Sequence, residues 1–588
     1  MKILGVFGGY YNPAACLIID GRMVAFIEEE KLTRKKTEKN TYPVRAIKFC
    51  LKQGGISMKD VDRIAFPWSA TRNITSLPWI GIKEMIKGLV GSTHGKFPVD
   101  VPSPVPGGFS NLMTFLSSTP WENRRRLNAE IRYGGILDKI PPVTFVPHHE
   151  SHAASCFYAS GFDKSLILIV DGMGDDLSSS IWIGEGRNIR KHREVKFPNS
   201  LGEFYSAFTE FIGFIPYSGE GKLMGLAAFG KKDESILKDL RDEVIQVGNG
   251  AYNVNTLYTI TGAHNFGERY TDALVALFGK PRPRESAFTD FHYNLAFGAQ
   301  HMLETAILDM LRVALKETGL KNLCIGGGVA MNCKMNGRVL HEAGVDAVFI
   351  NPASNDAGSA MGAAMVVAMQ NGDDCRFKME HAYWGPGYTN QQVEAMLKES
   401  KVIYRKSDNI AKEVADMLVE EKIIGWHQGR MEVGARALGA RSILASPLTR
   451  EMLDKVNNQV KHREPWRPFA PALIAEEAKN YYSLGAESPF MILAFEVLQE
   501  KRSKIPAVTH VDNSCRPQTI KREHNQKYYD AMKFFGEKTG VPVLLNTSFN
   551  VRGEPIVCSP EDSLRCFFAT GMDVLAIEDF LVFKDKLG

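Results

Sequence analysis

Several features are scarce in this sequence of 588 residues, and each scarcity excludes a class of function. No window approaches the roughly 18 apolar residues of a membrane-spanning helix, so we expect no membrane partner. The formal net charge is only +4, which provides no strong field for nucleic acid or a membrane surface. The start, MKILGVFGGYYNP, soon stops being apolar and is not typical of a signal peptide.

The cysteines likewise lack the patterns that carry function. There are nine, none of them in a CxxC pair, and an odd number makes a full disulfide framework a poor interpretation. We therefore expect a protein of the reducing cytoplasm.

Glycine-rich turns are what the chain does have, at 8–9, 172–174 and 326–328, each after an apolar strand. Backbone amides in such turns can approach phosphates closely. The pattern of strands around a glycine turn begins at residue 1 and recurs near residue 165, which predicts a duplicated α/β unit with a nucleotide cleft. Length favours two domains, and we place the boundary in the polar stretch 370–388, giving domains 1–375 and 376–588.

The stretch FVPHHESHAAS, at 145–155, places His148 and His152 four residues apart, on one face of a helix. This spacing suits two ligands of one metal ion, although a solvated helix start would look the same. The zinc-protease pattern H-E-x-x-H fails here by one residue. Asp171 ends a buried strand and Asp356 lies between a strand and a small-residue helix. Two histidines and two aspartates form a suitable set for iron, manganese or zinc, but the sequence does not place the four together.

Further motifs follow in order: GEGKLMGLAAFG (219–230), GGGVAMNCKMNGR (326–338), GRMEVGARALGARSILASP (429–447), VKHREPWRPFAP (460–471), VTHVDNSCRPQ (508–518) and LLNTSFNVRGEPIV (544–557). Together with HHESHAAS, DGMGD and NDAGSAMGAA, they resemble the NodU/CmcH/TobZ O-carbamoyltransferases along nearly the whole chain. The resemblance implies an actin/Hsp70-like (ASKHA) N-terminal domain and a YrdC-like α/β C-terminal domain. It also implies a cytoplasmic enzyme that makes carbamoyladenylate from carbamoyl phosphate and ATP and then carbamoylates a hydroxyl group.

The same resemblance implies site residues. It implies that Fe²⁺, or Mn²⁺ or Zn²⁺ in its place, is held by His148, His152, Asp171 and Asp356, with His149 as a neighbour. Mg²⁺ is expected to accompany ATP. The positions implied for carbamoyl phosphate and ATP are Arg436, Lys461, Arg467, Arg516 and Asn546, and Arg552 is a further candidate. Structural roles are an equal alternative for Arg430, Arg441 and Arg463.

In the N-terminal domain the turn around Gly327 and Gly328 is expected to cradle the adenylate, with Gly172 in the second glycine turn. Asn332 is expected to bond the ribose or base. Lys222 could meet phosphate or cap a carbonyl. Lys36 could reach the adenylate or lie on a charged turn.

Position 11 departs from the family pattern. Family members commonly read Tyr-His-Asp where this chain has Tyr10, Tyr11 and Asn12, so that Tyr11 replaces a histidine that is a candidate general base. A phenolate at neutral pH would cost roughly 4 kcal/mol unless a neighbour lowered the pKa. We keep three interpretations for Tyr11 and Asn12 as catalytic candidates: an activated tyrosine, a base elsewhere, or an altered transfer step. Ala435 in place of the usual proline is a milder departure.

Two other functions compete with a small-molecule carbamoyltransferase of natural-product type. A tRNA threonylcarbamoyl-modifying enzyme should carry a basic stripe, which the net charge does not indicate. An actin-like nucleotide-binding protein without transfer would not need the arginine-rich C-terminal domain. We therefore expect a small-molecule acceptor, no nucleic acid and a homodimer. The stretch 70–140, with Trp79, is the candidate lining of the acceptor pocket or a dimer contact.

Overall fold

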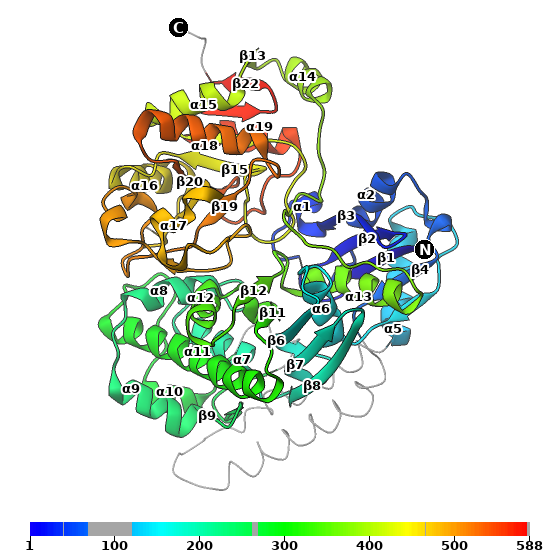
Figure 1. The fold of residues 1–588 in the computed structure, drawn as a ribbon, viewed down its shortest axis with the longest axis vertical. Helices are drawn as coiled ribbons and strands as arrows, with labels where there is room; N and C mark the ends of the chain where they lie inside the picture. The colour runs from blue at the N-terminus through cyan, green and yellow to red at the C-terminus, as the bar shows by residue number, and fades with distance from the viewer. Residues whose placement is uncertain (39, 69–119, 262–268, 465, 585–588) are drawn as a thin grey trace. The chain divides into compact units, whose positions relative to one another are not determined.

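The computed structural model describes residues 1–38, 40–68, 120–261, 269–464 and 466–584 (Figure 1). The chain forms two compact units: unit 1 comprises Met1–Val24 and Lys39–Lys378, and unit 2 comprises Ala25–Glu38 and Met379–Gly588. The predicted division at residue 375 stays a prediction. Most of the candidate acceptor stretch, including Trp79, lies outside the described residues.

The first sheet of unit 1 begins with the predicted glycine-turn strand. Its strands are β1 (Lys2–Phe7), β2 (Ala14–Ile19), β3 (Arg22–Glu28), β4 (Arg63–Phe66) and β5 (Val143–Phe145), in the spatial order β3-β2-β1-β4-β5. β1 is antiparallel to β2 and parallel to β4, and β4 is parallel to β5. The IDGR turn connects β2 to β3, as the sequence predicts.

The second sheet repeats this topology strand for strand. It contains β6 (Lys164–Gly174), β7 (Leu177–Glu185), β8 (Asn188–Lys196), β11 (Asn322–Gly326) and β12 (Ala347–Ile350), in the order β12-β11-β6-β7-β8. Its first strand is again antiparallel to the second and parallel to the fourth, and the fourth is parallel to the fifth. The duplicated actin/Hsp70-like architecture predicted for the N-terminal part is therefore confirmed.

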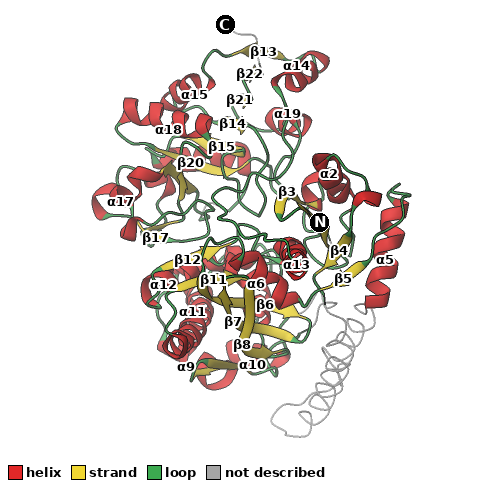
Figure 2. Cartoon of the chain, turned by 45° about the vertical axis from the view of Figure 1, so that its right-hand side comes forward, coloured by secondary structure: helices red, strands yellow, loops and turns green. Residues whose placement is uncertain are grey.

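Two helices, α6 (His148–Phe157) and α13 (Asp356–Gln370), pack on each other, α13 against the first sheet and α6 against the second (Figure 2). Small residues make the approach close. A Cβ added at Gly362 of α13 would lie 1.7 Å from the carbonyl oxygen of Ser151 in α6, and one added at Gly5 of β1 would lie 2.0 Å from that of Ala360. The small residues of α13 are therefore required for its close packing on α6 and β1. This packing fixes the position of Asp356, the first residue of α13.

In the described part of unit 1 the other helices are α2 (Val44–Gly54), α5 (Pro120–Tyr133), α7 (Leu201–Phe211), α8 (Glu220–Leu226), α9 (Glu234–Asp239), α10 (Asp272–Phe278), α11 (Asp290–Thr318) and α12 (Cys333–Glu342). A hairpin pairs β9 (Ile245–Gly248) with β10 (Ala251–Val254). α11 is the long amphipathic helix predicted at 290–318. It is capped at Thr289 and ends at Gly319, which adopts the left-handed conformation.

Unit 2 is built on an eight-stranded mixed sheet in the order β13-β22-β21-β14-β15-β20-β16-β19. The strands are β13 (Ile403–Lys406), β14 (Ile424–His427), β15 (Arg441–Ala445), β16 (Ala470–Ile474), β19 (Gln518–Ile520), β20 (Val543–Ser548), β21 (Val574–Ile577) and β22 (Phe580–Phe583). Helices α15 (Ile410–Val419) and α18 (Gln526–Thr539) lie side by side and share a core with the sheet, where Trp426 and Phe535 are fully buried (Figure 1). The predicted α/β character of the C-terminal part is confirmed.

Short helices complete unit 2: α1 (Glu29–Thr33), α14 (Asn390–Glu399), α16 (Arg450–Val456), α17 (Ala478–Tyr481) and α19 (Pro560–Phe568). Among the described residues of both units, no helix has the length and apolar character needed to cross a membrane.

Candidate metal centre and donor site

Helix α6 places the two candidate histidines on one face, as their spacing predicts. His148 and His152 are both fully buried, and their Nε2 atoms approach to 3.0 Å. Nearly every side chain of this helix is buried. The alternative of a solvated helix start is therefore wrong.

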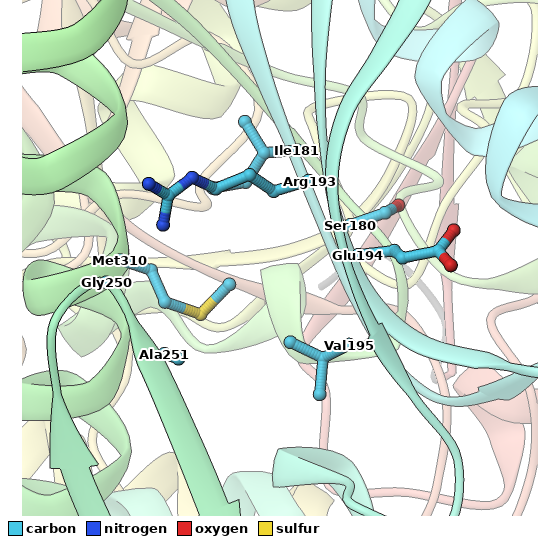
Figure 3. A pocket seen from close by; sticks show the side chains of 8 residues that line it. All are labelled: Ser180, Ile181, Arg193, Glu194, Val195, Gly250, Ala251 and Met310. Atoms are coloured by element: carbon cyan, nitrogen blue, oxygen red, sulfur yellow. The ribbon is translucent and has the colours of Figure 1, made fainter.

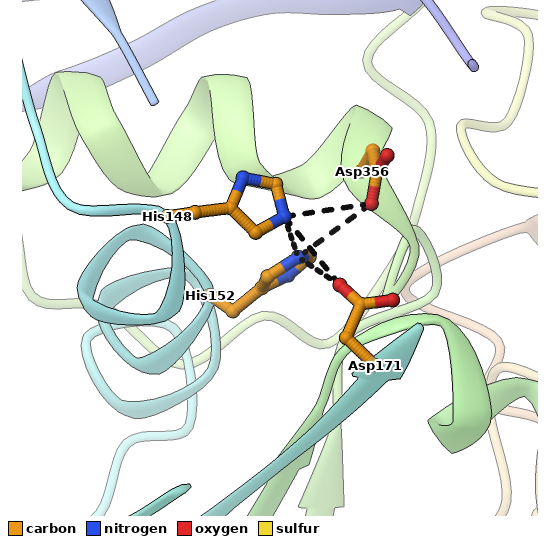
Figure 4. Close-up of side chains that lie close together, drawn as sticks. All are labelled: His148, His152, Asp171 and Asp356. Carbon is orange, nitrogen blue, oxygen red and sulfur yellow. Dashed lines mark hydrogen bonds and ion pairs between the residues drawn. The ribbon is translucent and has the colours of Figure 1, made fainter. Parts of the chain in front are cut away.

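The two candidate carboxylates meet these nitrogens (Figure 4). Asp171 Oδ2, from β6, lies 3.4 Å from His148 Nε2 and 3.2 Å from His152 Nε2. Asp356 Oδ1, at the start of α13, lies 3.6 and 3.8 Å from the same two atoms. One ligand atom from each of the four residues lies within 4.8 Å of the other three. The four residues come from three elements that are separate in the sequence: α6, β6 and α13.

Surrounding contacts orient one histidine and one aspartate of this set toward the other two residues. His148 Nδ1 lies 2.9 Å from the carbonyl oxygen of Pro67, so it carries the proton and leaves the Nε2 lone pair for a cation. The amides of Gly172 and Gly328 donate to Asp171 Oδ1, which turns Oδ2 toward the histidines. Burial alone lowers the pKa of His148, but the carboxylates of Asp171 and Asp356 outweigh it and hold the pKa well above its usual value, so a metal ion that binds at Nε2 displaces a proton from it. Two imidazoles and two carboxylates are donors that suit a divalent transition metal.

His149 points elsewhere. Its Nδ1 lies 2.7 Å from Ser180 Oγ, and burial holds its pKa well below the ordinary value. Ser180 lines a cavity of about 260 Å³ beside Arg193, Glu194 and Met310 (Figure 3). None of the predicted site residues lines this cavity, so it is not the candidate site.

Tyr11 lies in a polar aromatic cluster that the sequence analysis missed. Its ring centroid is 4.9 Å from that of Tyr217, whose hydroxyl donates to Glu203 Oε1 at 2.9 Å. Arg269, fully buried, donates to Glu203 Oε2 at 3.2 Å and lies over the Tyr217 ring. Burial raises the pKa of Tyr11, so its hydroxyl keeps its proton at neutral pH. Asn12 beside it adopts the left-handed backbone conformation, at a φ of 52°.

The glycine turn at 326–328 is built without room for side chains. Gly327 has a φ of +89°, and a Cβ there would lie 2.2 Å from the carbonyl oxygen of Val170. A Cβ at Gly328 would lie 3.1 Å from Asp171 Oδ1. The other glycine turn is less crowded, because a Cβ at Gly172 would meet only Glu203 Oε1 within 4 Å, at 3.7 Å. The turn at 326–328 therefore brings backbone amides beside the carboxylate cluster.

Two other predicted nucleotide contacts of unit 1 have different surroundings. Asn332 caps α12 by accepting from the Met335 amide, and its side-chain amide exchanges two hydrogen bonds with Gln300. Lys222, in the first turn of α8, lies over the ring of Phe214.

In unit 2 the predicted phosphate contact Lys461 lies among other cations. This lysine is buried and donates to the carbonyl oxygens of Ser548 and Asn550 at 2.8 and 3.0 Å. Burial lowers its pKa well below the usual value, and the charges of Arg463, Arg467 and Lys36 lower it further. Lys36, from the Ala25–Glu38 segment, therefore belongs to the same concentration of positive charge.

Two of the neighbouring arginines share one acidic partner. Glu464 forms ion pairs with Arg467 at 3.5 Å and Arg552 at 4.0 Å. Burial lowers the pKa of Arg467, and Arg516 and Arg552 lower it further. Arg516 Nε is buried and has no hydrogen-bond partner among the described residues. A surplus of cations around one carboxylate is the character of an anion-binding site.

Asn546 and Arg436 lie on adjoining structure. Asn546 is buried in β20, where its Nδ2 donates to the carbonyl of Ala437 and to Gln518, while its Oδ1 has no partner among the described residues. Arg436 is half-buried in the loop between β14 and β15. The link from Asn546 to Ala437 joins the strand to this arginine loop.

Two family models match the chain: Carbamoyltransferase N-terminus over residues 2–98 and 108–365, and Carbamoyltransferase C-terminus over residues 415–584. The chain belongs to the carbamoyltransferase family. Nodulation protein NolNO of Sinorhizobium fredii is 34% identical to this carbamoyltransferase over 582 residues, covering 98% of the chain and 79% of the relative. An uncharacterized protein of Synechocystis is 38% identical over 622 residues, covering 99% and 96%. The predicted family and the predicted carbamoyltransferase activity are confirmed.

Likeness to solved structures is partial. The (R)-2-hydroxyglutaryl-CoA dehydratase component A of Acidaminococcus fermentans covers 63% of this carbamoyltransferase and 98% of its own chain, with a TM-score of 0.32 and 12% identity. The actin/Hsp70-like assignment of unit 1 therefore rests on its repeated strand order.

For three arginines, Arg430, Arg441 and Arg463, the sequence left a structural role as an equal alternative. In this carbamoyltransferase all three donate hydrogen bonds to backbone carbonyls. Arg441, fully buried, donates to five backbone carbonyl oxygens, among them those of Gln428 and Cys558. Arg430 donates to the carbonyls of Trp384 and Gly385. Arg463 donates to those of Arg467 and Pro468. Arg441 thereby holds the loop that carries Arg436, and Arg463 holds the backbone of Arg467.

Proposed function

We propose that this carbamoyltransferase makes carbamoyladenylate from carbamoyl phosphate and ATP in unit 2, and transfers the carbamoyl group to a hydroxyl of a small-molecule acceptor in unit 1. The observation that carries the donor half is the surplus of cations around Glu464. Carbamoyl phosphate and ATP are both polyanions, and the arginine fork binds phosphate oxygens through two parallel hydrogen bonds.

Three side chains of the cluster take direct roles in the donor half. Arg516, whose Nε has no protein partner among the described residues, binds a phosphate group. Arg467 and Arg552 share one carboxylate and keep most of their hydrogen-bonding capacity for ligand. The atoms balance with one water: carbamoyl phosphate, ATP and water give carbamoyladenylate, pyrophosphate and inorganic phosphate. Mg²⁺ offsets part of the charge of ATP.

The unit 1 cluster fits a divalent metal ion because neighbouring residues set both the tautomer of His148 and the orientation of the Asp171 carboxylate. His148, His152, Asp171 and Asp356 would hold it, and these nitrogen and oxygen donors suit Fe²⁺, Mn²⁺ or Zn²⁺. When bound, such an ion supplies Lewis acidity toward a carbonyl or phosphoryl oxygen.

Transfer forms a bond from the acceptor oxygen to the carbamoyl carbon and breaks the bond from that carbon to AMP. The turn at Gly327 and Gly328 brings its backbone close to the adenylate because neither residue carries a side chain, while the Gly328 amide stays on Asp171 Oδ1. Tyr11 keeps its proton, because burial raises its pKa, so it donates a hydrogen bond and does not act as the base. The proton of the acceptor hydroxyl is then taken up by the phosphate of the departing AMP or by another group.

The donor half is tested by pyrophosphate release from ATP with and without carbamoyl phosphate. Arg516→Ala should lower the rate about 10- to 100-fold, because a charged hydrogen bond contributes about 1.5–3 kcal/mol. Arg565→Ala is the matched control, since Arg565 is exposed and pairs with Asp562 on the surface of α19. Release that does not depend on carbamoyl phosphate, or equal rates in both variants, would overturn the proposal.

A further inference from the structure

A short segment from the N-terminal part of the sequence is built into unit 2. Residues Ala25–Glu38 comprise the end of β3 and helix α1, and they group with Met379–Gly588. Glu28 and Lys31 of this segment are 6% and 1% exposed. Charged side chains are almost never buried this deeply unless they hold a specific partner.

Both side chains hold the same residue of unit 2. The amide of Gly434 donates to Glu28 Oε1 at 2.7 Å, and Lys31 Nζ donates to the carbonyl oxygen of Gly434 at 3.1 Å. Gly434 is buried and has a φ of +94°, a conformation that glycine adopts without strain. Glu28 and Lys31 thus clamp one peptide residue on both of its sides.

Gly434 lies two residues before Arg436 in the loop between β14 and β15. From the inside, Glu432 Oε1 accepts the amides of Leu438, at 2.6 Å, and Arg441, at 3.2 Å. Along residues 431–440 every residue is buried except Ala435 and Arg436. The loop is therefore held from both sides, and Arg436 is the charged residue at its tip.

Arg34 extends the same pattern to a second loop. It donates to the carbonyl of Pro555 at 2.8 Å and to that of Ile556, and its Nε lies 3.4 Å from Asp562 Oδ1. Glu28 precedes the first turn of α1, Lys31 lies within the helix, and Arg34 follows its end in the left-handed conformation. All three side chains form hydrogen bonds to loops of the Met379–Gly588 part, so together they dock the segment there.

We infer that Glu28 and Lys31 are positioning residues of the donor site, which hold the Gly434 turn so that Arg436 is presented to carbamoyl phosphate. This inference rests on the proposed function. It makes the donor site of unit 2 dependent on a segment that precedes most of unit 1 in the sequence. Polar groups that orient a ligand-binding side chain typically change affinity 10- to 100-fold when removed.

The test uses the full chain and measures pyrophosphate release against carbamoyl phosphate and against ATP. Lys31→Met should raise the KM for carbamoyl phosphate about 10- to 100-fold, with a smaller change for ATP. Lys35→Met is the matched control, because Lys35 lies in the same segment and is exposed. Glu28→Gln keeps an acceptor for the Gly434 amide and should stay closer to the native KM than Glu28→Ala.

Two further measurements separate positioning from general loss of structure. In an Arg436→Ala background, Lys31→Met should add no further rise in KM, since it acts through Arg436. Hydrogen exchange of the 432–441 amides should be faster in Lys31→Met than in Lys35→Met. This measurement does not depend on which reaction the enzyme catalyses. A KM and an exchange rate equal to those of Lys35→Met would overturn the clamp while leaving the proposed function intact. A native chain that makes no pyrophosphate would overturn both.

Discussion

The spacing of α6 and α13 gives a prediction whose magnitude follows from the structure. The substitution Gly362→Ala puts a Cβ 1.7 Å from the carbonyl oxygen of Ser151, whereas ordinary contact begins at 3.4 Å. The helices must therefore shift by about 1.7 Å at this point. α6 carries His148 and His152, and α13 carries Asp356. Metal–ligand distances tolerate only about 0.2 Å, so a shift of this size removes at least one ligand.

We expect Gly362→Ala to lower the affinity for Mn²⁺ or Zn²⁺ about 100-fold or more. Loss of a residue that only hydrogen-bonds to a metal ligand typically costs about 10- to 100-fold, and here a ligand itself is displaced. The assay is metal titration of the full chain against a competing chelator, with metal content per chain measured after desalting. Overpacking should also cost about 1–3 kcal/mol of stability, so circular dichroism must show that the variant is folded at the assay temperature.

The control is Gly248→Ala, in the same unit, where an added Cβ meets nothing within 4 Å. A folded Gly362→Ala protein that binds metal as tightly as Gly248→Ala would refute the reasoning that helix spacing sets the cluster.

Three further predictions concern single groups. Asp171→Asn keeps an acceptor for the Gly172 and Gly328 amides but removes the anionic oxygen, so metal content should fall with an unchanged thermal midpoint; retention of metal would contradict this. Arg441→Met leaves several buried carbonyls without a donor and should cost about 3 kcal/mol or more, seen as a lower thermal midpoint of unit 2; an unchanged midpoint would argue against its structural role. Arg269→Met leaves Glu203 unpaired and should destabilise unit 1 by about 3–5 kcal/mol in denaturant titrations, with partial recovery in the double variant with Glu203→Gln; no recovery would count against the ion pair.

Local patterns were enough to predict parts of the centre. The four-residue spacing of His148 and His152 predicted a shared helix face, and the repeated glycine turns predicted a duplicated unit. The meeting of Asp171 with Asp356 could not be predicted from local pattern, because it depends on helix contacts such as Gly362 against Ser151. In the sequence analysis these four residues came together only through the family resemblance.

For the arginines, the motifs indicated candidate residues but not which of them are structural. Motif spacing marks Arg441 and Arg516 alike, yet one is fully buried on backbone carbonyls and the other has a buried Nε without a partner among the described residues. Which arginine binds carbonyls depends on loops that meet in three dimensions. The attachment of Lys31 to Gly434, 403 residues away, is likewise invisible to pattern. Glu203 and Arg269 were missed because an isolated Glu and an isolated Arg carry no signal.

The most direct measurement is detection of carbamoyladenylate itself. Purified full chain is incubated with ATP, carbamoyl phosphate, Mg²⁺ and either Fe²⁺ or Mn²⁺, without an acceptor, and the products are analysed by mass spectrometry. We predict carbamoyladenylate together with pyrophosphate, and about 10- to 100-fold slower formation of both in Arg516→Ala. Absence of carbamoyladenylate from the native chain under these conditions would contradict the proposed donor chemistry.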